Sequence, residues 1–307
     1  MSYFMSFQHV LITGGASGLG LGCARRFAAL ARAITICDIN EVAGRRVVAE
    51  LAREYPQVSW QFQAVDLASA DSIAALCERL TAAGQAIDVL VNNAGVYPAA
   101  QRVLTDEGAE LTFSIALLGH FRLTAGIWPL LVAAPAARVV TISSMVQRQA
   151  RLDLDNLDLA RGYMPIKAYQ QSKLATLLFA LELQRRLDAH PQLSIRSYAA
   201  HPGVCRSQLG RNRPRAATDG WWARLSYWAL ARGIARFGQT PEQAASTVIE
   251  AATTQRHPGG SYFGPGGLLE IAGKPRLSAL GKAARSPELA RGLWQRAEQL
   301  TGLSIPV

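Results

Sequence analysis

The sequence predicts an α/β protein built on one doubly wound parallel sheet with helices on both faces. Short apolar runs, each as long as a buried strand, alternate with longer stretches in which apolar residues recur at helical spacing. A glycine-rich turn joins the first run to the first helix, and polar residues follow several later runs. This alternation is typical of right-handed β-α-β units, whose parallel strands end at one edge of the sheet. We expect one domain over residues 1–307, because no linker, repeat or low-complexity segment interrupts the chain.

The composition is that of a globular protein. Half of the 307 residues are hydrophobic, which is enough to bury a large core. The formal net charge of +10 comes almost wholly from arginine, but no dense basic run with interleaved aromatic residues favours nucleic acid. The cysteines show no Cys-x-x-Cys pair and no histidine at metal spacing, so we expect a metal-independent protein in the reducing cytoplasm. The first strand begins too early for a signal peptide, and no apolar stretch is long enough to span a bilayer.

The first strand is expected over residues 10–12, and the first helix from Gly18 onward. In the glycine-rich turn between them, backbone N–H groups can approach a phosphate closely, and the positive end of the helix dipole points at it. The turn therefore predicts a pyrophosphate site. Its expected cofactor-binding residues are Gly14, Ser17, Gly18, Leu19 and Gly20.

The second apolar run, residues 33–37, ends at Asp38. A carboxylate at this distance from the glycine-rich turn accepts hydrogen bonds from the adenosine ribose and repels a 2′-phosphate, which favours NAD over NADP. The alternative interpretation is that Asp38 only helps to open the next helix. An NADPH-dependent carbonyl reductase, the competing function, needs a basic residue near that ribose. The nearest are Arg45 and Arg46, one helical turn or more away.

The alternation continues along the chain. Helices are expected over 40–55, 69–83 and 110–131, with strands over 58–65, 87–91 and 138–142. In the helix over 40–55, the residues expected to face the sheet are Val42, Val47, Leu51 and Ala52. Polar groups follow the strands at Asp66, at 92–95 and at Ser143 and Ser144, so we expect them at the carboxyl edge, where ligands bind in this architecture.

A helix over 168–187 carries Tyr169 and Lys173, which are four residues apart and so share one face. A phenol with a pKa near ~10 is a weak base at neutral pH unless a positive charge stabilises the phenolate, and Lys173 can supply that charge. The competing interpretation is an exposed helical pair without function. Tyr163 and Lys167 repeat the spacing, but Pro165 forces the preceding residue out of helical geometry, so we exclude that pair.

Several motifs carry a family resemblance. Residues 13–20, 92–95, Ser144 and 169–173, in that order, resemble the short-chain dehydrogenase/reductase superfamily, which has a Rossmann-like fold. Residues 118–121, 168–175, 201–203 and 260–263 are similar to its retinol-dehydrogenase-like branch. The resemblance covers nearly the whole chain. It implies an oxidoreductase that transfers hydride between a nicotinamide cofactor and an alcohol or carbonyl.

The resemblance also implies roles for individual residues. Tyr169 is the general acid/base, Lys173 stabilises its phenolate and binds the nicotinamide ribose, and Ser144 hydrogen-bonds the reacting oxygen. His201 belongs to the turn that packs on the nicotinamide and is not the proton carrier. The further cofactor contacts implied are Asp66, Leu67, Asn93, Ala94, Gly95, Pro202, Gly203, Val204 and Ser207.

One position departs from the family pattern. The family usually has an asparagine two residues before 118–121, where it helps to hold a proton-relay water, but this chain has Ala116. Only the backbone carbonyl of Ala116 remains for that role, and Ser114 points to another face of the helix. This departure is the one sequence feature in favour of a third function, a catalytically weak dinucleotide-binding regulatory protein.

Residues 203–240 are expected to form a lid over the substrate. The segment 221–230 is rich in tryptophan and favours a bulky apolar alcohol or carbonyl; an interfacial helix in peripheral contact with a membrane, or simple packing, are the alternatives. The remaining elements expected are a strand over 194–200, a helix over 240–253, a last strand over 260–263, and a C-terminal helix from Ser286 to Gly302. By analogy with the superfamily, two long helices could form a homodimer interface.

Overall fold

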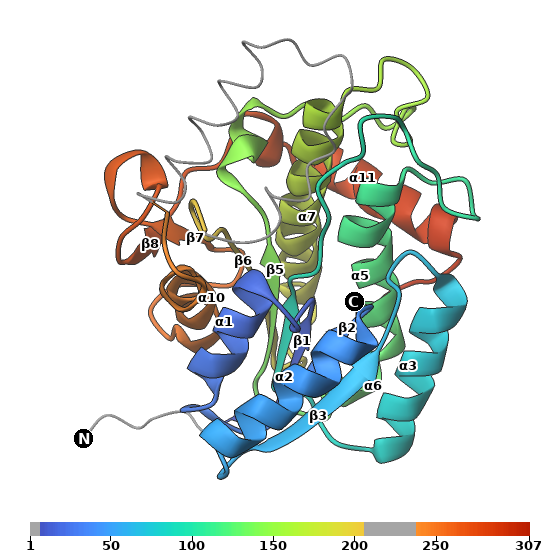
Figure 1. Ribbon diagram of the computed structural model, residues 1–307. Coiled ribbons are helices and arrows are strands. Elements are labelled where there is room, and N and C mark those ends of the chain that lie inside the picture. Colours follow the sequence, from blue (N-terminus) through green and yellow to red (C-terminus); the bar gives the residue numbers. More distant parts are fainter. Residues whose placement is uncertain (1–6, 206–237) are drawn as a thin grey trace.

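In the computed structural model, residues 7–205 and 238–307 are described, and their strands form one eight-stranded sheet (Figure 1). The strands are β1 (Phe7–Thr13), β2 (Ala31–Asp38), β3 (Ser59–Ala64), β4 (Val89–Asn92), β5 (Ala137–Ile142), β6 (Ile195–Ala200), β7 (Tyr262–Pro265) and β8 (Pro275–Leu277). Their spatial order is β3-β2-β1-β4-β5-β6-β7-β8. Strands β1 to β7 pair in parallel, as predicted, and the order reverses between β1 and β4, where ligands bind in such sheets.

Strand β8 corrects the prediction that residues 260–263 form the last strand. It pairs antiparallel with β7, through partners such as Phe263 and Leu277. The strand is three residues long and begins with a proline, so the sequence carries no apolar run that would predict it. The segment between β7 and β8 contains the short helix η4 (Leu268–Glu270).

The prediction of one continuous helix over 110–131 is wrong. The chain forms α4 (Leu111–Phe113), a π-helical turn η1 (Ser114–Leu118), α5 (Gly119–Gly126) and α6 (Trp128–Val132). Pro129 explains the break between α5 and α6, since it lacks an N–H group and is tolerated only in the first turn of a new helix. The π-helical turn has no signal in the apolar periodicity, and such turns often occur at functional sites.

Most of the other helices follow the prediction, but the single helix expected over 240–253 is divided into two at Ala245. The other helices are α1 (Gly18–Phe27), α2 (Glu41–Glu54), α3 (Ala70–Ala83), α7 (Pro165–Leu187), α9 (Pro241–Ala244), α10 (Ser246–Thr253) and α11 (Pro287–Thr301), with short 3₁₀ turns η2 (Met145–Gln149) and η5 (Ala283–Arg285). Helices α1, α2 and α10 cover one face of the sheet, and α3, α5 and α7 the other, so that two hydrophobic clusters flank it (Figure 1).

Two residues predicted to face the sheet from α2 do not. Val47 and Leu51 are buried, but Ala52 is exposed and Val42 is 82% exposed. Val42 precedes Val47 by five residues, which places it ~140° around the helix from the buried stripe. In α11, Leu300 is half exposed, whereas Leu293 and Ala297 are buried.

Helix α11 packs across α5 and α7. The ring of Trp294 stacks on Phe179 of α7, with ring centroids 5.8 Å apart, and meets the edge of Phe121 of α5 at 5.2 Å. Helix α11 therefore covers part of α5 and part of α7. Within the described ranges, no helix has the length and apolar character needed to cross a membrane.

Candidate active site

The glycine-rich turn leaves the first turn of α1 open to an anion. Gly14 and Gly18 have positive φ angles of 64° and 50°, and a Cβ at Gly20 would overlap the Gly14 carbonyl oxygen. Ser17, the N-cap of α1, makes no side-chain capping bond, whereas Asn40 and Ser69 cap α2 and α3 with theirs. The first N–H groups of α1 therefore keep their hydrogen-bonding capacity. This geometry fits the predicted pyrophosphate.

A second turn, after β4, is bonded to the first. The side-chain amide of Asn93 donates to the carbonyl oxygens of Thr13 at 2.7 Å and Gly14 at 3.3 Å. In return, the backbone N–H groups of Asn93 and Ala94 donate to the Thr13 hydroxyl at 2.9 and 3.0 Å. Asn93, predicted only as a cofactor contact, is thus a brace that holds the turn 92–95 against the glycine-rich turn.

His120 supports the same unit from α5. Its Nδ1 bonds the carbonyl oxygen of Ala116 at 2.9 Å, and since a carbonyl only accepts, that nitrogen carries the proton. Nε2 then accepts from the Thr13 hydroxyl at 2.8 Å. Burial, reinforced by the charge of Lys173, lowers the pKa of His120 to about 4, so the ring is neutral at pH 7. The Ala116 carbonyl therefore accepts a hydrogen bond from His120. In the sequence analysis this carbonyl was the only group of Ala116 that could take part in a proton relay.

Asp38 lies between the glycine-rich turn and α2. One carboxylate oxygen accepts from the backbone N–H of Ala16 and the other from that of Asn40, both at 3.0 Å. The structure thus shows the helix-opening contact that was the alternative interpretation, and also a contact with the turn that precedes α1.

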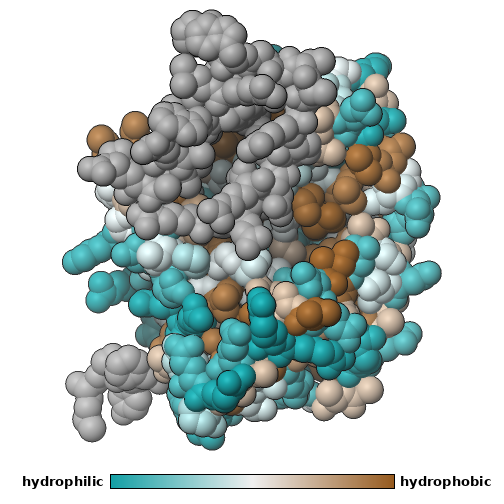
Figure 2. Space-filling view, in the orientation of Figure 1, coloured by the Kyte–Doolittle hydropathy of each residue, from teal (hydrophilic) through white to brown (hydrophobic). Residues whose placement is uncertain are grey.

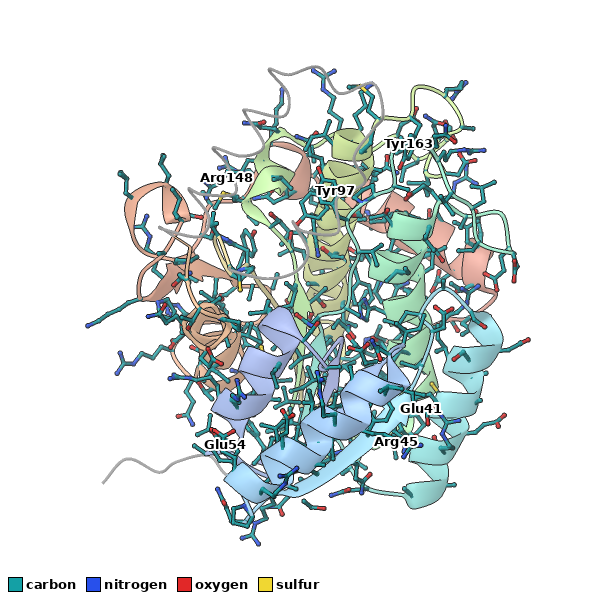
Figure 3. The ribbon with its side chains drawn as sticks, viewed as in Figure 1. Glu41, Arg45, Glu54, Tyr97, Arg148 and Tyr163 are labelled. Atoms are coloured by element: carbon teal, nitrogen blue, oxygen red, sulfur yellow. The ribbon has the colours of Figure 1, made fainter. Side chains whose placement is uncertain are left out.

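The two arginines considered for NADP recognition are paired on the surface of α2. The Arg45 guanidinium lies 2.6 Å from the Glu41 carboxylate (Figure 3), and that of Arg46 lies 3.7 Å from Glu50. The carboxylate of Asp66, after β3, accepts from the Ala68 N–H at 2.8 Å, and Leu67 is buried beside it.

Helix α7 brings Tyr169 and Lys173 to Ser144, which follows the end of β5. A hydrogen bond with Ser144 lowers the pKa of Tyr169, but burial raises that pKa more strongly. The ring of Tyr97 packs 5.4 Å from the ring of Tyr169. A Cβ at Gly95 would lie 3.6 Å from the Lys173 ammonium, so Lys173 also lies beside the turn after β4. Ser144, Tyr169 and Lys173 therefore lie at the same edge of the sheet as the glycine-rich turn and the turn after β4.

Lys173 is held by its backbone as well as by its ammonium group. The ammonium donates to the Ile142 carbonyl at 3.2 Å, while Ser143 Oγ donates to the Lys173 carbonyl at 2.6 Å. Thr176 donates to the same two carbonyls. Burial lowers the pKa of Lys173 to about 8. The sequence analysis did not predict the hydrogen bonds of Ser143 and Thr176. The only sequence feature that could have indicated them is a hydroxyl residue at the end of a predicted strand and another on the predicted helix.

As predicted, Tyr163 and Lys167 do not form a second tyrosine–lysine pair on a helix. Helix α7 begins at Pro165, and Met164 before it has the extended φ angle of −142°. The Tyr163 hydroxyl donates to the carbonyl of Ala99 at 2.7 Å and so packs the loop after β4; Figure 3 shows Tyr163 and Tyr97 at the same end of the molecule. Lys167 is exposed.

The turn 201–204 follows β6. Gly203 has a φ angle of +67°, the Val204 N–H donates to the Ile271 carbonyl at 2.9 Å, and the Gln239 side chain donates to the Pro202 carbonyl at 2.8 Å. The turn is therefore held between residue 239 and the segment after β7. Ser207, most of the predicted lid 203–240 and the aromatic segment 221–230 lie outside the described residues.

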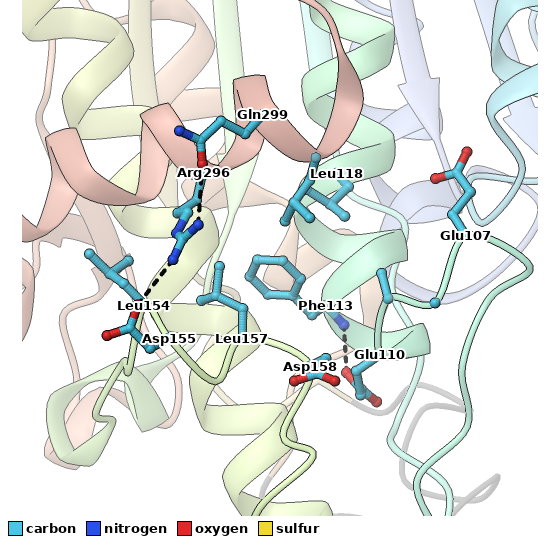
Figure 4. A pocket seen from close by; sticks show the side chains of 13 residues that line it. Glu107, Glu110, Phe113, Leu118, Leu154, Asp155, Leu157, Asp158, Arg296 and Gln299 are labelled. Atoms are coloured by element: carbon cyan, nitrogen blue, oxygen red, sulfur yellow. Dashed lines mark hydrogen bonds and ion pairs between the residues drawn. The ribbon is translucent and has the colours of Figure 1, made fainter.

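A separate cavity of about 390 Å³ lies between α11 and the loops around residues 107–113 and 154–158 (Figure 4). Its carboxylates are largely neutralised, since Asp155 lies 3.0 Å from Arg296, Asp158 lies 2.8 Å from Arg102, and Glu107 lies 2.6 Å from Arg122. None of Ser144, Tyr169 and Lys173 lines it. The chemistry predicted from the sequence is therefore elsewhere, at the carboxyl edge of the sheet.

Comparison with known proteins decides the family. Residues 8–217 match the model of the short chain dehydrogenase family, which is more than half of the chain. The chain belongs to this family. It is 34% identical to polyprenol dehydrogenase of Mus musculus, with 95% of this chain and 83% of the relative covered, and 33% identical to retinol dehydrogenase 14 of Homo sapiens, with 97% and 88% covered.

Solved structures agree with this assignment. A crystal structure of an uncharacterized protein from Mycobacterium paratuberculosis matches 99% of this chain and 96% of its own, with a TM-score of 0.76 and 30% identity. L-sorbose reductase of Gluconobacter frateurii, solved with NADPH and L-sorbose, has a TM-score of 0.61 at 21% identity, covers 85% of this chain and 96% of its own, and shows the shared fold. This short-chain dehydrogenase is therefore an oxidoreductase of the retinol-dehydrogenase-like branch that acts on alcohols or carbonyls. Its fold is one that binds NAD(P).

Proposed function

We propose that this short-chain dehydrogenase interconverts an alcohol and a carbonyl on a bulky apolar molecule, with Tyr169 as the general acid/base. The observation that carries the proposal is the meeting of Ser144, Tyr169 and Lys173 beside the turn after β4. That turn is hydrogen-bonded to Thr13, which precedes the glycine-rich turn, so the proton-transfer group and the pyrophosphate site lie at one connected edge of the sheet.

The roles of the three residues follow from their surroundings. When bound, the nicotinamide accepts or supplies the hydride. The Ser144 hydroxyl donates to the reacting oxygen, and Tyr169 takes the proton from it in oxidation and returns it in reduction. Because burial raises the pKa of Tyr169, its phenolate needs a nearby cation. Lys173, whose pKa is about 8, is mostly protonated at pH 7 and supplies that charge.

The substrate class is supported by the surface around Tyr169. The Tyr97 ring packs against Tyr169, and three apolar residues close to them in sequence, Val96, Met164 and Ile166, are 37%, 48% and 39% exposed. Figure 2 shows further hydrophobic residues, in brown, exposed on the face turned toward the viewer. Polyprenol and retinol, the alcohols in the names of two relatives, are apolar. An apolar substrate would cover side chains that are otherwise in contact with water.

NAD is the cofactor that we propose, with Asp38 as the residue that selects it. Replacing Asp38 by alanine should remove both the hydrogen-bond acceptor for the ribose 2′-hydroxyl and the charge that repels a 2′-phosphate. We expect wild type to bind NADH at least about tenfold more tightly than NADPH, which corresponds to ~1.4 kcal/mol, and this preference to collapse in Asp38→Ala. Fluorescence titration of both cofactors measures the dissociation constants.

Asp71→Ala is the control for that experiment, since Asp71 is an exposed acid in the first turn of α3. It should leave the preference unchanged. Tighter binding of NADPH by wild type would replace this proposal with the NADPH-dependent reductase. Binding of neither cofactor would contradict the pyrophosphate site itself.

A further inference from the structure

A buried carboxylate lies at the back of the turn 201–204. Glu270, at the end of η4, is 7% exposed, and its Oε2 accepts from three side chains. These are His201 at 2.9 Å, Ser278 at 2.7 Å and Arg148 at 2.7 Å. The three donors come from the turn after β6, from the segment after β8 and from η2. These three segments are far apart in the sequence.

The backbone at Glu270 is strained to make these contacts. Leu269 and Glu270 have φ angles of +52° and +57°, two consecutive left-handed residues that are not glycine. Residues other than glycine rarely adopt this conformation, and they keep it only where the surroundings hold them. The hydrogen bonds of the Glu270 side chain provide that hold, and they keep the carboxylate behind the turn.

The same turn determines which ring nitrogen of His201 carries the hydrogen. The backbone N–H of Gly203 donates to Nδ1 at 3.2 Å, so Nε2 carries the proton and donates to Glu270. Burial lowers the pKa of His201, which keeps the ring neutral. Ser278 bonds the same nitrogen as the carboxylate. The trio therefore lacks the arrangement of a hydrolytic triad, in which serine and carboxylate bond opposite nitrogens.

Glu270 connects two sides of the candidate active site. Arg148 belongs to η2, whose N-cap is Ser144, and His201 begins the turn that the family resemblance places on the nicotinamide. Gln147 of η2 adds to the connection, because its side chain bonds the Ala279 carbonyl at 3.1 Å and the Gly281 N–H at 3.0 Å. The segment from 270 to 281 thus spans from the turn 201–204 to the residues after Ser144.

We propose that Glu270 is a positioning residue for the nicotinamide half of the cofactor. Through His201 it fixes the turn 201–204, and through Arg148 it fixes that turn relative to the segment that starts at Ser144. The proposal rests on the proposed function, since it assumes that the dinucleotide binds along this edge. It assigns Glu270 no contact with substrate or cofactor.

The test compares the whole cofactor with ADP-ribose, which lacks only the nicotinamide ring. ADP-ribose contains the part that the glycine-rich turn and Asp38 would bind, but it has no nicotinamide. In Glu270→Gln, which keeps the shape but removes the charge that holds Arg148 and His201, we expect the Kd of NADH to rise about tenfold and that of ADP-ribose to change less than about twofold. Calorimetric titration of both ligands measures the two constants.

Glu288→Gln, an exposed glutamate at the start of α11, is the matched control and should change neither constant. An equal loss for both ligands, or no loss for NADH, overturns the proposal while leaving Asp38 and Tyr169 in their roles. Failure of wild type to bind NADH would contradict the proposed function as well. If Glu270→Gln does not fold, Ser278→Ala removes one bond to the carboxylate, and a selective rise of about threefold in the NADH Kd is then the expected result.

Discussion

Tyr169→Phe is expected to lower kcat/KM for an apolar alcohol by about 10³-fold, while the Kd of NADH stays within about twofold of wild type. The substitution removes one hydroxyl and keeps the ring that packs against Tyr97. Lys173 and Ser144 remain, so charge and orientation are retained but no group is left to carry the proton. Steady-state oxidation of retinol or a long-chain alcohol with NAD, followed at the absorbance of NADH, measures the loss.

The chain provides its own control in Tyr163→Phe. The same hydroxyl is removed six residues earlier, where it donates to the Ala99 carbonyl. Losing that bond should reduce the free energy of unfolding by about 1 kcal/mol and leave kcat/KM within about threefold. Turnover by Tyr169→Phe at the wild-type rate would mean that another group carries the proton. An inactive wild type that still binds NADH would favour the regulatory interpretation.

The layout of this edge of the sheet could be predicted because its determinants are local in sequence. Apolar runs of strand length, the glycine-rich turn and the spacing of Tyr169 and Lys173 each need only a few neighbouring residues to be recognised. Parallel pairing then brings the carboxyl ends of β1, β4 and β5 together, without any further information. The exclusion of Tyr163 and Lys167 was equally local, since it depended on Pro165 alone.

The features that escaped prediction depend on contacts between distant residues. His201 and Glu270 are 69 positions apart, and Thr13 and His120 are 107 apart, so no window of sequence contains both partners. The π-helical turn at 114–118 and the exposure of Val42 likewise depend on how neighbouring elements pack. These contacts supply the support behind the predicted residues.

Lys173→Met is expected to exchange activity for stability. Turnover should fall by about 10²-fold or more, because the phenolate of Tyr169 loses its cation. The protein should at the same time become more stable at pH 7, by up to about 3 kcal/mol, because a charged group is no longer buried. The Ile142 carbonyl keeps a donor in Thr176, so the substitution leaves no buried acceptor unpaired.

The pH dependence identifies the source of that gain. Burial lowers the pKa of Lys173 from 10.5 to about 8 in the folded protein. Between these values the unfolded chain binds more protons than the folded one, so Lys173 makes wild type more stable as the pH rises from 8 to 10.5. Below pH 8 both states are charged and the full cost of burial remains. The advantage of Lys173→Met should therefore be largest at pH 7 and mostly gone by pH 10.

Urea denaturation of both proteins at pH 7 and pH 10 measures this difference. Burial raises the pKa of Cys23, Cys37 and Tyr262 well above this range, so these groups titrate here only in the unfolded chain. Their contribution to the pH dependence is the same in both proteins and cancels in the comparison. Lys167→Met, on the exposed side of the same helix, should change stability by less than about 0.5 kcal/mol at either pH. A Lys173→Met protein less stable than wild type at pH 7 would mean that the ammonium serves as a structural tether to Ile142. A gain in stability with a loss of turnover would mean that the chain retains a buried, destabilising cation for its chemistry.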